Sequence, residues 1–332
     1  MEYRKLGHSE LNLSAITFGA WAAGGWAWGG NASIDAIKAI ESAFDEGVNA
    51  FDTAPIYGQG VSEDIVGEAL MAIPRDQVYI LTKFGMRWDL AKGDFAMKSQ
   101  NNFGKEIDVY KYAGAQSVID ECEASLRRLR TDYIDLYQIH WPDSTTPIEE
   151  TFTAVDKLIK DGKIRYAGVC NYTAAQMAEA EKYVQLASNQ VPYSMLRRDI
   201  EKEVVPYCLE NGKGILAYSP MERGLLTGKL KPGHKFGEGD HRSGLSQFSD
   251  ENITRTNAFL EKIKPIADEK ELTLGQLVLL WTINQPGITI ALAGARNEQQ
   301  SIENARAAGK SLTHDEIGRI NSELESFGLN KK

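Results

Sequence analysis

Three titratable residues stand where short apolar runs of the chain end: Asp52, Lys83 and His140. Side chains alternate along a strand, so Val48 and Ala50 share one face with Asp52, and the other two residues follow the same pattern. A carboxylate or ammonium group removed from water needs a partner of opposite charge. The sequence therefore predicts an Asp52–Lys83 ion pair where two strands end, which by itself would be only a structural salt bridge.

Tyr57 favours a catalytic role for this pair. It follows Asp52 by five residues, in a turn-rich segment that can fold the phenol back over the strand ends. A phenol ionises at about pH 10, and a neighbouring ammonium lowers that pKa while a carboxylate keeps the lysine charged. A histidine at a strand end is by itself more often a satisfied core residue. Together, however, Asp52, Tyr57, Lys83 and His140 predict a unit that delivers a proton.

The elements that position these residues follow a repeating order in which short apolar runs alternate with longer segments of helical period. Eight such repeats with short connections predict the α/β class, with parallel strands closed into a (β/α)8 TIM barrel. The predicted strands are 16–18, 48–51, 78–81, 134–137, 164–169, 186–191, 214–218 and 288–292. The predicted helices are 33–46, 63–71, 115–130, 148–160, 174–183, 201–210, 255–268 and 298–308.

Four further segments complete the predicted architecture. An N-terminal β-hairpin is expected over residues 1–14, and an extra C-terminal helix outside the barrel over 313–327. Residues 84–114 and 219–249 are long, polar and follow strands, so we expect loops at the carboxyl end of the barrel, where substrates bind. No linker or shift in composition divides the chain, and we expect one domain over residues 1–332.

Composition and charge argue against several classes of protein. The 332 residues are 42% hydrophobic and 25% charged, as in an ordinary globular protein. The net charge of −9 offers no basic surface for a nucleic acid or an anionic membrane. Three cysteines without CxxC spacing and scattered histidines predict neither disulfides nor a metal site. With no signal peptide or spanning segment, we expect a cytoplasmic protein that binds small molecules, and the oligomeric state stays open.

The chain resembles the aldo-keto reductases over essentially its whole length, in particular the bacterial branch with long loops that is related to general-stress and channel-β-like reductases. A Rossmann dehydrogenase is a poor alternative, because no GxGxxG motif follows a predicted strand. The motifs that carry the resemblance are Phe51-Asp52-Thr53-Ala54 with Tyr57-Gly58, Thr82-Lys83, residues 132–136 leading to His140-Trp141-Pro142, residues 162–165 running into 168–171, Ala217-Tyr218-Ser219-Pro220, residues 223–229, and Gly294-Ala295-Arg296 with Gln300, Glu303 and Asn304.

The resemblance implies hydride transfer from NADPH to an aldehyde or ketone, with Tyr57 as general acid. Asp52 and Lys83 would tune Tyr57, and His140 would donate a hydrogen bond to the carbonyl oxygen. Arg296 favours NADPH over NADH, because a guanidinium group matches a ribose phosphate. The residues implied in cofactor binding are Trp21, Asp52, Cys170, Asn171, Gln190, Tyr218, Ser219, Pro220, Met221, Arg223, Gly224, Lys229, Gly294, Arg296, Gln300, Glu303 and Asn304.

Two departures and two alternatives accompany this resemblance. Cys170 stands where the family often has serine, and a thiol is a poorer hydrogen-bond partner. The long segment 84–114 prevents transfer of substrate contacts from the family, although tryptophans at loop positions suit an organic carbonyl compound. One alternative is a cofactor-sensing regulatory subunit of the channel-β type. The other is an NAD(P)-dependent polyol or sugar-alcohol dehydrogenase, since the same residues catalyse the reverse reaction.

Overall fold

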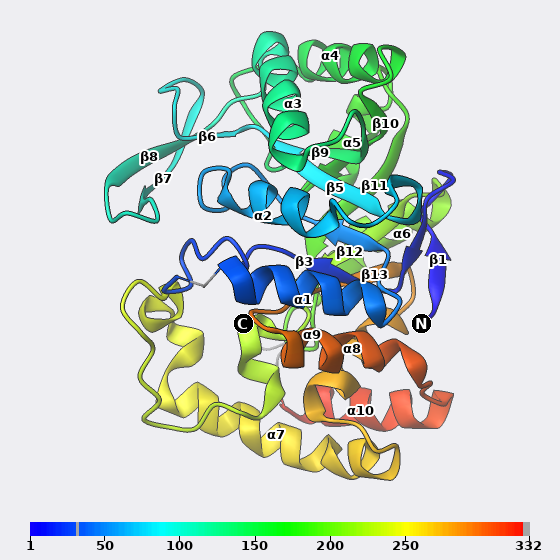
Figure 1. Cartoon of the computed structure of the whole chain (residues 1–332). Coiled ribbons are helices and arrows are strands. Elements are labelled where there is room, and N and C mark those ends of the chain that lie inside the picture. Colours follow the sequence, from blue (N-terminus) through cyan, green and yellow to red (C-terminus); the bar gives the residue numbers. More distant parts are fainter. Residues whose placement is uncertain (31–32, 328–332) are drawn as a thin grey trace.

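Eight parallel strands close into a barrel in the computed structural model, which describes residues 1–30 and 33–327 (Figure 1). Each strand pairs with the strands before and after it in the barrel sequence, and the last strand returns to the first, with Leu292 beside Thr17. The predicted (β/α)8 TIM barrel is therefore confirmed. The strands are β3 (Ile16–Gly19), β4 (Ala50–Asp52), β5 (Tyr79–Phe84), β9 (Ile134–Ile139), β10 (Ile164–Cys170), β11 (Leu186–Pro192), β12 (Gly214–Tyr218) and β13 (Ile288–Gly294).

Helices surround this barrel, and their sequences explain why they form and which face they bury. In the third helix, Val118, Cys122, Leu126 and Leu129 recur at helical spacing and are all buried against the strands. The helices that follow the eight strands are α1 (Ser33–Asp45), α2 (Val61–Leu70), α3 (Ala115–Leu129), α4 (Ile148–Lys160), α5 (Ala174–Ala180), α6 (Val204–Glu210), α8 (Leu274–Ile283) and α9 (Glu298–Arg306). Two more, α7 (Asp250–Glu269) and α10 (His314–Phe327), pack together outside the barrel (Figure 1).

The seventh repeat differs from the sequence prediction. Residues 255–268 were expected to supply its barrel helix, but they belong to α7, and the barrel helix is α8. Nearly every residue of α8 is buried, so its sequence has no polar face to produce a helical period. A capping box marks where it begins, since Thr273 accepts from the backbone of Gln276 and the Gln276 side chain accepts in return. No helix in the described ranges is long and apolar enough to cross a membrane.

The segment 84–114 also differs from its prediction as a loop. It forms a three-stranded antiparallel sheet in the order β6-β8-β7, built from β6 (Met86–Arg87), β7 (Asp94–Gln100) and β8 (Glu106–Lys111), which extends away from the barrel (Figure 1). Phe95 and Met97 of β7 are exposed, and most of its other residues are polar. A strand exposed in this way lacks the apolar alternation that would have revealed it. Residues 219–249 contain only short 3-10 turns, as expected of a loop.

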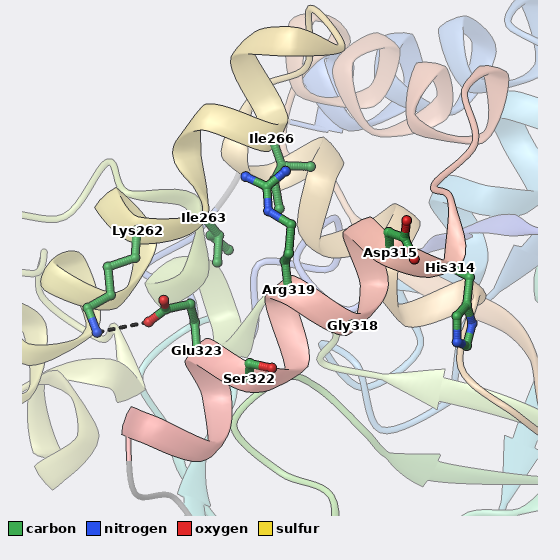
Figure 2. A pocket seen from close by; sticks show the side chains of 9 residues that line it. All are labelled: Lys262, Ile263, Ile266, His314, Asp315, Gly318, Arg319, Ser322 and Glu323. Atoms are coloured by element: carbon green, nitrogen blue, oxygen red, sulfur yellow. Dashed lines mark hydrogen bonds and ion pairs between the residues drawn. The ribbon is translucent and has the colours of Figure 1, made fainter.

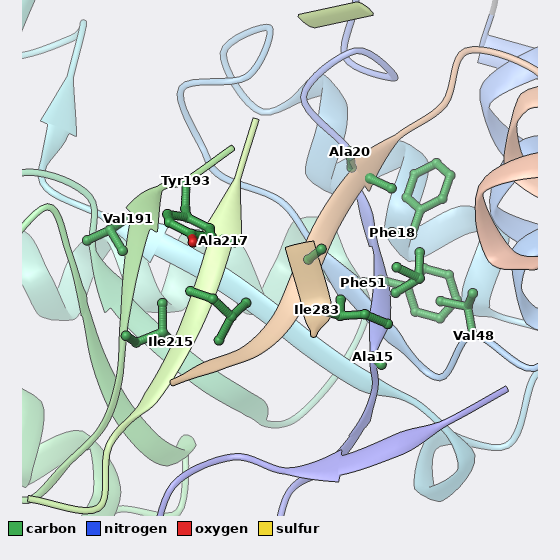
Figure 3. Packing of buried hydrophobic residues seen from close by; sticks show 14 of the residues in the cluster. Ala15, Phe18, Ala20, Val48, Phe51, Val191, Tyr193, Ile215, Ala217 and Ile283 are labelled. Atoms are coloured by element: carbon green, nitrogen blue, oxygen red, sulfur yellow. The ribbon is translucent and has the colours of Figure 1, made fainter. Parts of the chain in front are cut away.

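The N-terminal hairpin closes one end of the barrel. Its strands are β1 (Tyr3–Lys5) and β2 (Asn12–Ser14), and the apolar cluster inside the barrel includes its fully buried residues Leu6, Leu11 and Leu13. A second apolar cluster lies between the strands and the helices, and Figure 3 shows part of it around Phe18 and Phe51. The strands are thus packed on both faces, which leaves the polar residues at their carboxyl ends as exceptions.

We predict that Leu11→Ala lowers the free energy of unfolding by about 2–5 kcal/mol, because it removes buried methyl groups from the barrel interior. Urea denaturation followed by circular dichroism measures the change. Leu209→Ala is the control, since Leu209 is 59% exposed and its loss should cost no more than about 0.5 kcal/mol. Equal effects of the two substitutions would mean that the hairpin contributes nothing to the core.

Candidate active site

The predicted tetrad lies at the carboxyl ends of three neighbouring strands. Asp52 is the last residue of β4, Lys83 is the fifth residue of β5, and His140 follows the end of β9. Parallel pairing of β4 with β5 and of β5 with β9 brings these three side chains to one end of the barrel. Tyr57 comes from the turn after β4. Gly58 is required there, because its φ is +70° and a Cβ would lie 2.7 Å from the carbonyl oxygen of Gly24.

The predicted Asp52–Lys83 ion pair is present and buried. Lys83 Nζ donates to Asp52 Oδ1 over 2.6 Å and to the carbonyl oxygen of Thr53 over 2.8 Å. The Lys83 side chain has no exposed surface, and that of Asp52 is 4% exposed. Burial opposes the charge on Lys83, but Asp52 and Tyr57 outweigh it and raise the pKa of Lys83 above its usual value. The lysine is therefore an ammonium ion at neutral pH.

Two buried amides hold the other oxygen of this carboxylate. Gln190 Nε2 donates to Asp52 Oδ2 over 2.8 Å, and Gln138 Nε2 donates to the same atom over 3.4 Å. Gln138 was not among the predicted site residues, although it alternates with His140 on one face of β9. Its amide does not titrate, so nothing in its type pointed to chemistry. Its contact with Asp52 makes Gln138 a positioning residue for the ion pair.

Tyr57 lies against the ammonium group and the other rings of the site. Lys83 Nζ is 5.1 Å from the centroid of the Tyr57 ring, and the His140 ring meets it edge-on at 5.7 Å. Burial raises the pKa of Tyr57 to about 12, with Lys83 acting in the opposite direction and Asp52 adding to the rise. This net direction is opposite to the lowering expected from the sequence. Tyr57 therefore holds its proton throughout the neutral range.

His140 is neutral and has an unused ring nitrogen. Burial, followed by repulsion from Lys83, holds its pKa well below the usual value. Its Nδ1 atom is buried and has no hydrogen-bond partner among the described residues. A neutral imidazole has one donor and one acceptor nitrogen, so this ring can still donate one hydrogen bond. Its backbone is fixed on one side by Asn171, whose Nδ2 donates to the His140 carbonyl oxygen over 3.1 Å.

The residues predicted to hold the nicotinamide end of a cofactor lie beside the tetrad. Asn171 has a positive φ of 60°, and its Oδ1 accepts from the Tyr218 hydroxyl over 3.0 Å. The Cys170 thiol is buried, which raises its pKa and keeps it neutral, and it faces Gln138 Oε1 at 3.9 Å. Cys170 therefore contacts the amide of Gln138, which bonds to Asp52. Gln190, which the resemblance places at the carboxamide, donates to Asp52.

The loop after β12, predicted to contact a pyrophosphate, begins with an unusual backbone. Ser219, Glu222 and Arg223 have positive φ angles of 55°, 46° and 55°, in the left-handed region that non-glycine residues seldom adopt. Gly224 also has a positive φ, and the backbone N–H groups of Glu222 and Gly224 donate within the segment, to the carbonyl oxygens of Ser219 and Met221. The half-buried guanidinium group of Arg223 lies 5.7 Å from the Trp21 ring centroid. Pyrophosphate binding by Ser219–Gly224 stays a prediction, and the Arg223 guanidinium group is the part of this segment best suited to it.

The residues predicted for the adenosine end gather where β13 leads into α9. Asn304 Nδ2 donates to the carbonyl oxygen of Gly294 over 3.1 Å, and Gln300 Oε1 accepts from the Arg296 backbone over 3.0 Å. Lys229 from the β12 loop forms an ion pair with Glu303 over 3.2 Å. The Arg296 side chain also donates to the carbonyl oxygen of Gly30 over 2.9 Å. This region therefore connects the loops after β3, β12 and β13.

The loop after β12 also meets the loop after β3 through residues that the sequence did not indicate. Asp240 pairs with Trp28 in an isolated β-bridge, and the backbone N–H of His241 donates to Ala27 over 3.0 Å. Arg242 forms an ion pair with Asp240 over 2.6 Å and donates to the Arg223 carbonyl oxygen over 3.1 Å. No motif marked residues 240–242, because their partners lie far away in the chain.

A hollow between α7 and α10 lies outside this region. Figure 2 shows the residues that line it, among which Lys262 Nζ and Glu323 Oε2 form an ion pair over 2.8 Å between the two helices. None of its lining residues belongs to the strand ends or to the loops that carry the predicted site. The candidate active site is therefore the carboxyl end of the barrel.

Comparison with known proteins decides the family. The sequence model described as "Aldo/keto reductase family" matches residues 15–325. The chain belongs to the aldo-keto reductases. It is 35% identical to the aldo-keto reductase YhdN of Bacillus subtilis (strain 168), an alignment of 328 residues that covers 98% of this chain and 94% of the relative. It is 37% identical to the NADH-specific methylglyoxal reductase of Escherichia coli (strain K12), over 93% of this chain and 94% of that enzyme.

Solved structures agree with this assignment. The glycerol dehydrogenase AKR11B4 from Gluconobacter oxydans superposes with a TM-score of 0.88 at 34% identity, over 100% of this chain and 97% of that one. As an aldo-keto reductase, the chain is an NAD(P)H-dependent oxidoreductase of a family that acts on small carbonyl substrates. The Escherichia coli relative has an NADH-specific name, so family membership alone does not choose between NADH and NADPH.

A buried glutamate supports the wall of this reductase site next to Lys83. Glu121 of α3 accepts from the backbone N–H of Gly85 over 3.0 Å and from Ser117 Oγ over 3.1 Å, and Arg87 lies 3.7 Å away. Burial raises the pKa of Glu121 to about 7, although Arg87 and the two hydrogen bonds oppose the rise. The folded protein therefore binds a proton here that the unfolded chain releases at about pH 4.5.

We predict that this proton makes stability fall as the pH rises. Because the pKa of Glu121 is higher in the folded protein than in the unfolded chain, its contribution to stability is complete below about pH 4.5. That contribution is lost as the pH rises to about 7, which lowers the free energy of unfolding by up to about 3 kcal/mol. Glu121→Gln should therefore gain stability relative to the wild type as the pH passes through this window. Urea titrations at several pH values measure the difference. Glu150→Gln is the control, because Glu150 also accepts a backbone N–H but is exposed. An equal gain in stability for Glu150→Gln over the same pH range would refute the assignment to Glu121.

Proposed function

We propose that the chain is an NADPH-dependent reductase of small aldehydes and ketones, with Tyr57 as the general acid. The observation that carries this proposal is the buried Asp52–Lys83 ion pair beneath Tyr57. An acid must hold its proton before the reaction and then be stabilised without it. Burial provides the first condition, because it raises the pKa of Tyr57 to about 12, and the Lys83 ammonium provides the second.

The side chains around this pair fit a nicotinamide dinucleotide. Asn171 and Gln190 carry amides suited to the carboxamide group, and the Tyr218 ring offers a face on which the nicotinamide can stack. The Arg223 guanidinium group suits a pyrophosphate, because it can pair with phosphate oxygens. Arg296 suits the additional ribose phosphate that distinguishes NADPH from NADH, because a guanidinium group pairs with phosphate oxygens through two charged hydrogen bonds.

The chain's own residues then control one proton and one developing charge. When bound, the cofactor supplies the hydride. Tyr57 donates its hydroxyl proton to the carbonyl oxygen, and Lys83 stabilises the phenolate that remains. Asp52 holds Lys83 in place through the 2.6 Å ion pair. His140, kept neutral by burial, donates a hydrogen bond to the same carbonyl oxygen and so orients it and stabilises its charge.

Oxidation of a polyol by the same residues is the second candidate, and the likeness to a glycerol dehydrogenase favours it. In that direction Tyr57 accepts a proton as a phenolate. Because burial raises the pKa of Tyr57 to about 12, the phenolate is scarce at neutral pH. We therefore expect reduction to dominate near pH 7, and oxidation to become faster as the pH rises.

We predict that Tyr57→Phe lowers kcat for aldehyde reduction by about 10²–10⁴-fold, the usual contribution of a general acid, and leaves the Kd for NADPH nearly unchanged. Stopped-flow oxidation of bound NADPH and fluorescence titration measure the two quantities. Tyr137→Phe is the control, because Tyr137 is a buried tyrosine outside the site whose hydroxyl bonds to Val118. Equal loss of turnover and of cofactor binding would contradict the acid role. Tight NADPH binding with no turnover of any carbonyl compound by the wild type would instead favour a cofactor-sensing subunit.

We predict that Arg296→Ala raises the Kd for NADPH by about 10–100-fold, because it removes hydrogen bonds to a charged group worth about 1.5–3 kcal/mol. The Kd for NADH should stay nearly constant. Arg306→Ala is the matched control, since Arg306 is an exposed arginine at the other end of α9 that pairs with Glu46. If Arg296→Ala weakens both cofactors equally, Arg296 acts through its bond to Gly30 and not through a ribose phosphate.

A further inference from the structure

Three buried ring nitrogens in the loops after β3 and β12 have no hydrogen-bond partner assigned to them within the described ranges. They are Trp21 Nε1, Trp28 Nε1 and His241 Nε2. The rings form one cluster, with centroids 5.4 Å apart for Trp21 and Trp28, and 5.1 Å from each of them to His241. A buried polar group without a partner costs about 1–3 kcal/mol. Three such groups in one cluster indicate that a ligand supplies the missing partners.

This aromatic cluster of Trp21, Trp28 and His241 adjoins the reacting groups. The Trp21 ring stacks on Tyr57 with centroids 6.1 Å apart and an angle of 29° between the planes. One member of the cluster, Trp21, is therefore in direct contact with the proposed acid. Trp21 thus connects Tyr57, where the substrate carbonyl oxygen is proposed to bind, with Trp28 and His241.

The hydrogen-bonding character of each nitrogen narrows the chemistry of that group. An indole nitrogen can only donate. His241 Nδ1 lies 2.5 Å from the carbonyl oxygen of Ala27, which can only accept, so Nδ1 carries the hydrogen. Burial lowers the pKa of His241, which leaves the ring neutral near pH 7. His241 Nε2 is therefore an acceptor.

An alcohol hydroxyl group is the simplest partner for this set, because it accepts one hydrogen bond and donates another. A ketone or aldehyde oxygen would satisfy the tryptophans but not His241, and an alkyl group would satisfy neither. We propose that Trp28 and His241 bind a hydroxyl group of the substrate, so that hydroxyaldehydes are preferred to aldehydes in which a methyl group replaces the hydroxyl. This inference rests on the proposed function, since the carbonyl group is placed by Tyr57.

The loops after β3 and β12 hold the two residues in position. The bridge between Trp28 and Asp240 joins the loops, and the Arg242 guanidinium group, paired with Asp240, lies 4.9 Å from the Trp28 ring centroid. The ring nitrogens are covered, so in this proposal a hydroxyl group reaches them when the two loops separate. The hydrogen bonds it gains then favour closure over the substrate.

The nicotinamide ribose of the cofactor also carries hydroxyl groups and offers the same chemistry. The two sources differ in what they change. A substrate hydroxyl affects the choice between substrates at constant cofactor affinity, whereas a ribose hydroxyl affects cofactor affinity and treats all substrates alike. The experiment must therefore measure both quantities on each variant.

Glycolaldehyde and propanal form the test pair, because they differ only by a hydroxyl in place of a methyl group. The variants Trp28→Phe and His241→Phe keep an aromatic ring and remove the polar nitrogen. We expect each to lower the ratio of kcat/KM for glycolaldehyde to that for propanal by about 3–10-fold, the value of one neutral hydrogen bond. The kcat/KM for propanal and the Kd for NADPH should stay close to those of the wild type. His234→Phe is the control, since His234 is an exposed histidine of the same loop.

Three results would overturn the inference. An equal loss of kcat/KM for both aldehydes would mean that the rings only shape the site. A higher Kd for NADPH with an unchanged substrate ratio would assign the hydroxyl partner to the ribose. An unchanged ratio and Kd in a folded variant would leave the nitrogens without a ligand. Each variant tests the inference independently if the other does not fold. Loss of the acid role of Tyr57 would appear separately, as full turnover by Tyr57→Phe.

Discussion

The ion pair between Asp52 and Lys83 is the constraint around which this end of the barrel is built. Two charges without access to water are tolerated only when each is paired and hydrogen-bonded, and removing one partner of such a pair costs about 3–5 kcal/mol. The carbonyl oxygen of Thr53 and the amides of Gln138 and Gln190 supply the remaining bonds. Lys83 is thereby held as an ammonium ion beneath Tyr57, where it can stabilise a phenolate.

The loops around these strand ends are joined to one another by specific contacts. The loops after β3 and β12 contact each other through Trp28 and Asp240, and the loop after β3 contacts the β6-β8-β7 sheet through a hydrogen bond from Trp26 to Gln100. Arg296, which is proposed to bind the ribose phosphate, bonds to the same β3 loop. The proposed cofactor and substrate regions therefore share one loop, on a barrel that fixes the proposed reacting groups.

Two different patterns in the sequence predicted the elements of the barrel. Strands packed on both faces appear as short apolar runs, and amphipathic helices such as α3 reveal their buried face at helical spacing. The same method failed for α8, which is buried all round, and for β7, which is exposed on both faces. Neither has the contrast between polar and apolar positions on which the method depends.

The sequence by itself determined which residues end the strands of the barrel, and therefore that Asp52, Lys83 and His140 face one another with Tyr57 nearby. Side chains alternate along every strand, and successive strands of a barrel pair in parallel, so the order of residue types is sufficient to predict which residues meet at this end of the barrel. Only the tertiary structure decided the balance of burial against charge that raises the pKa of Tyr57, the contact of Gln138 with Asp52, and the meeting of Trp28 with His241. These depend on distances between segments far apart in the chain, which no local pattern of residues specifies.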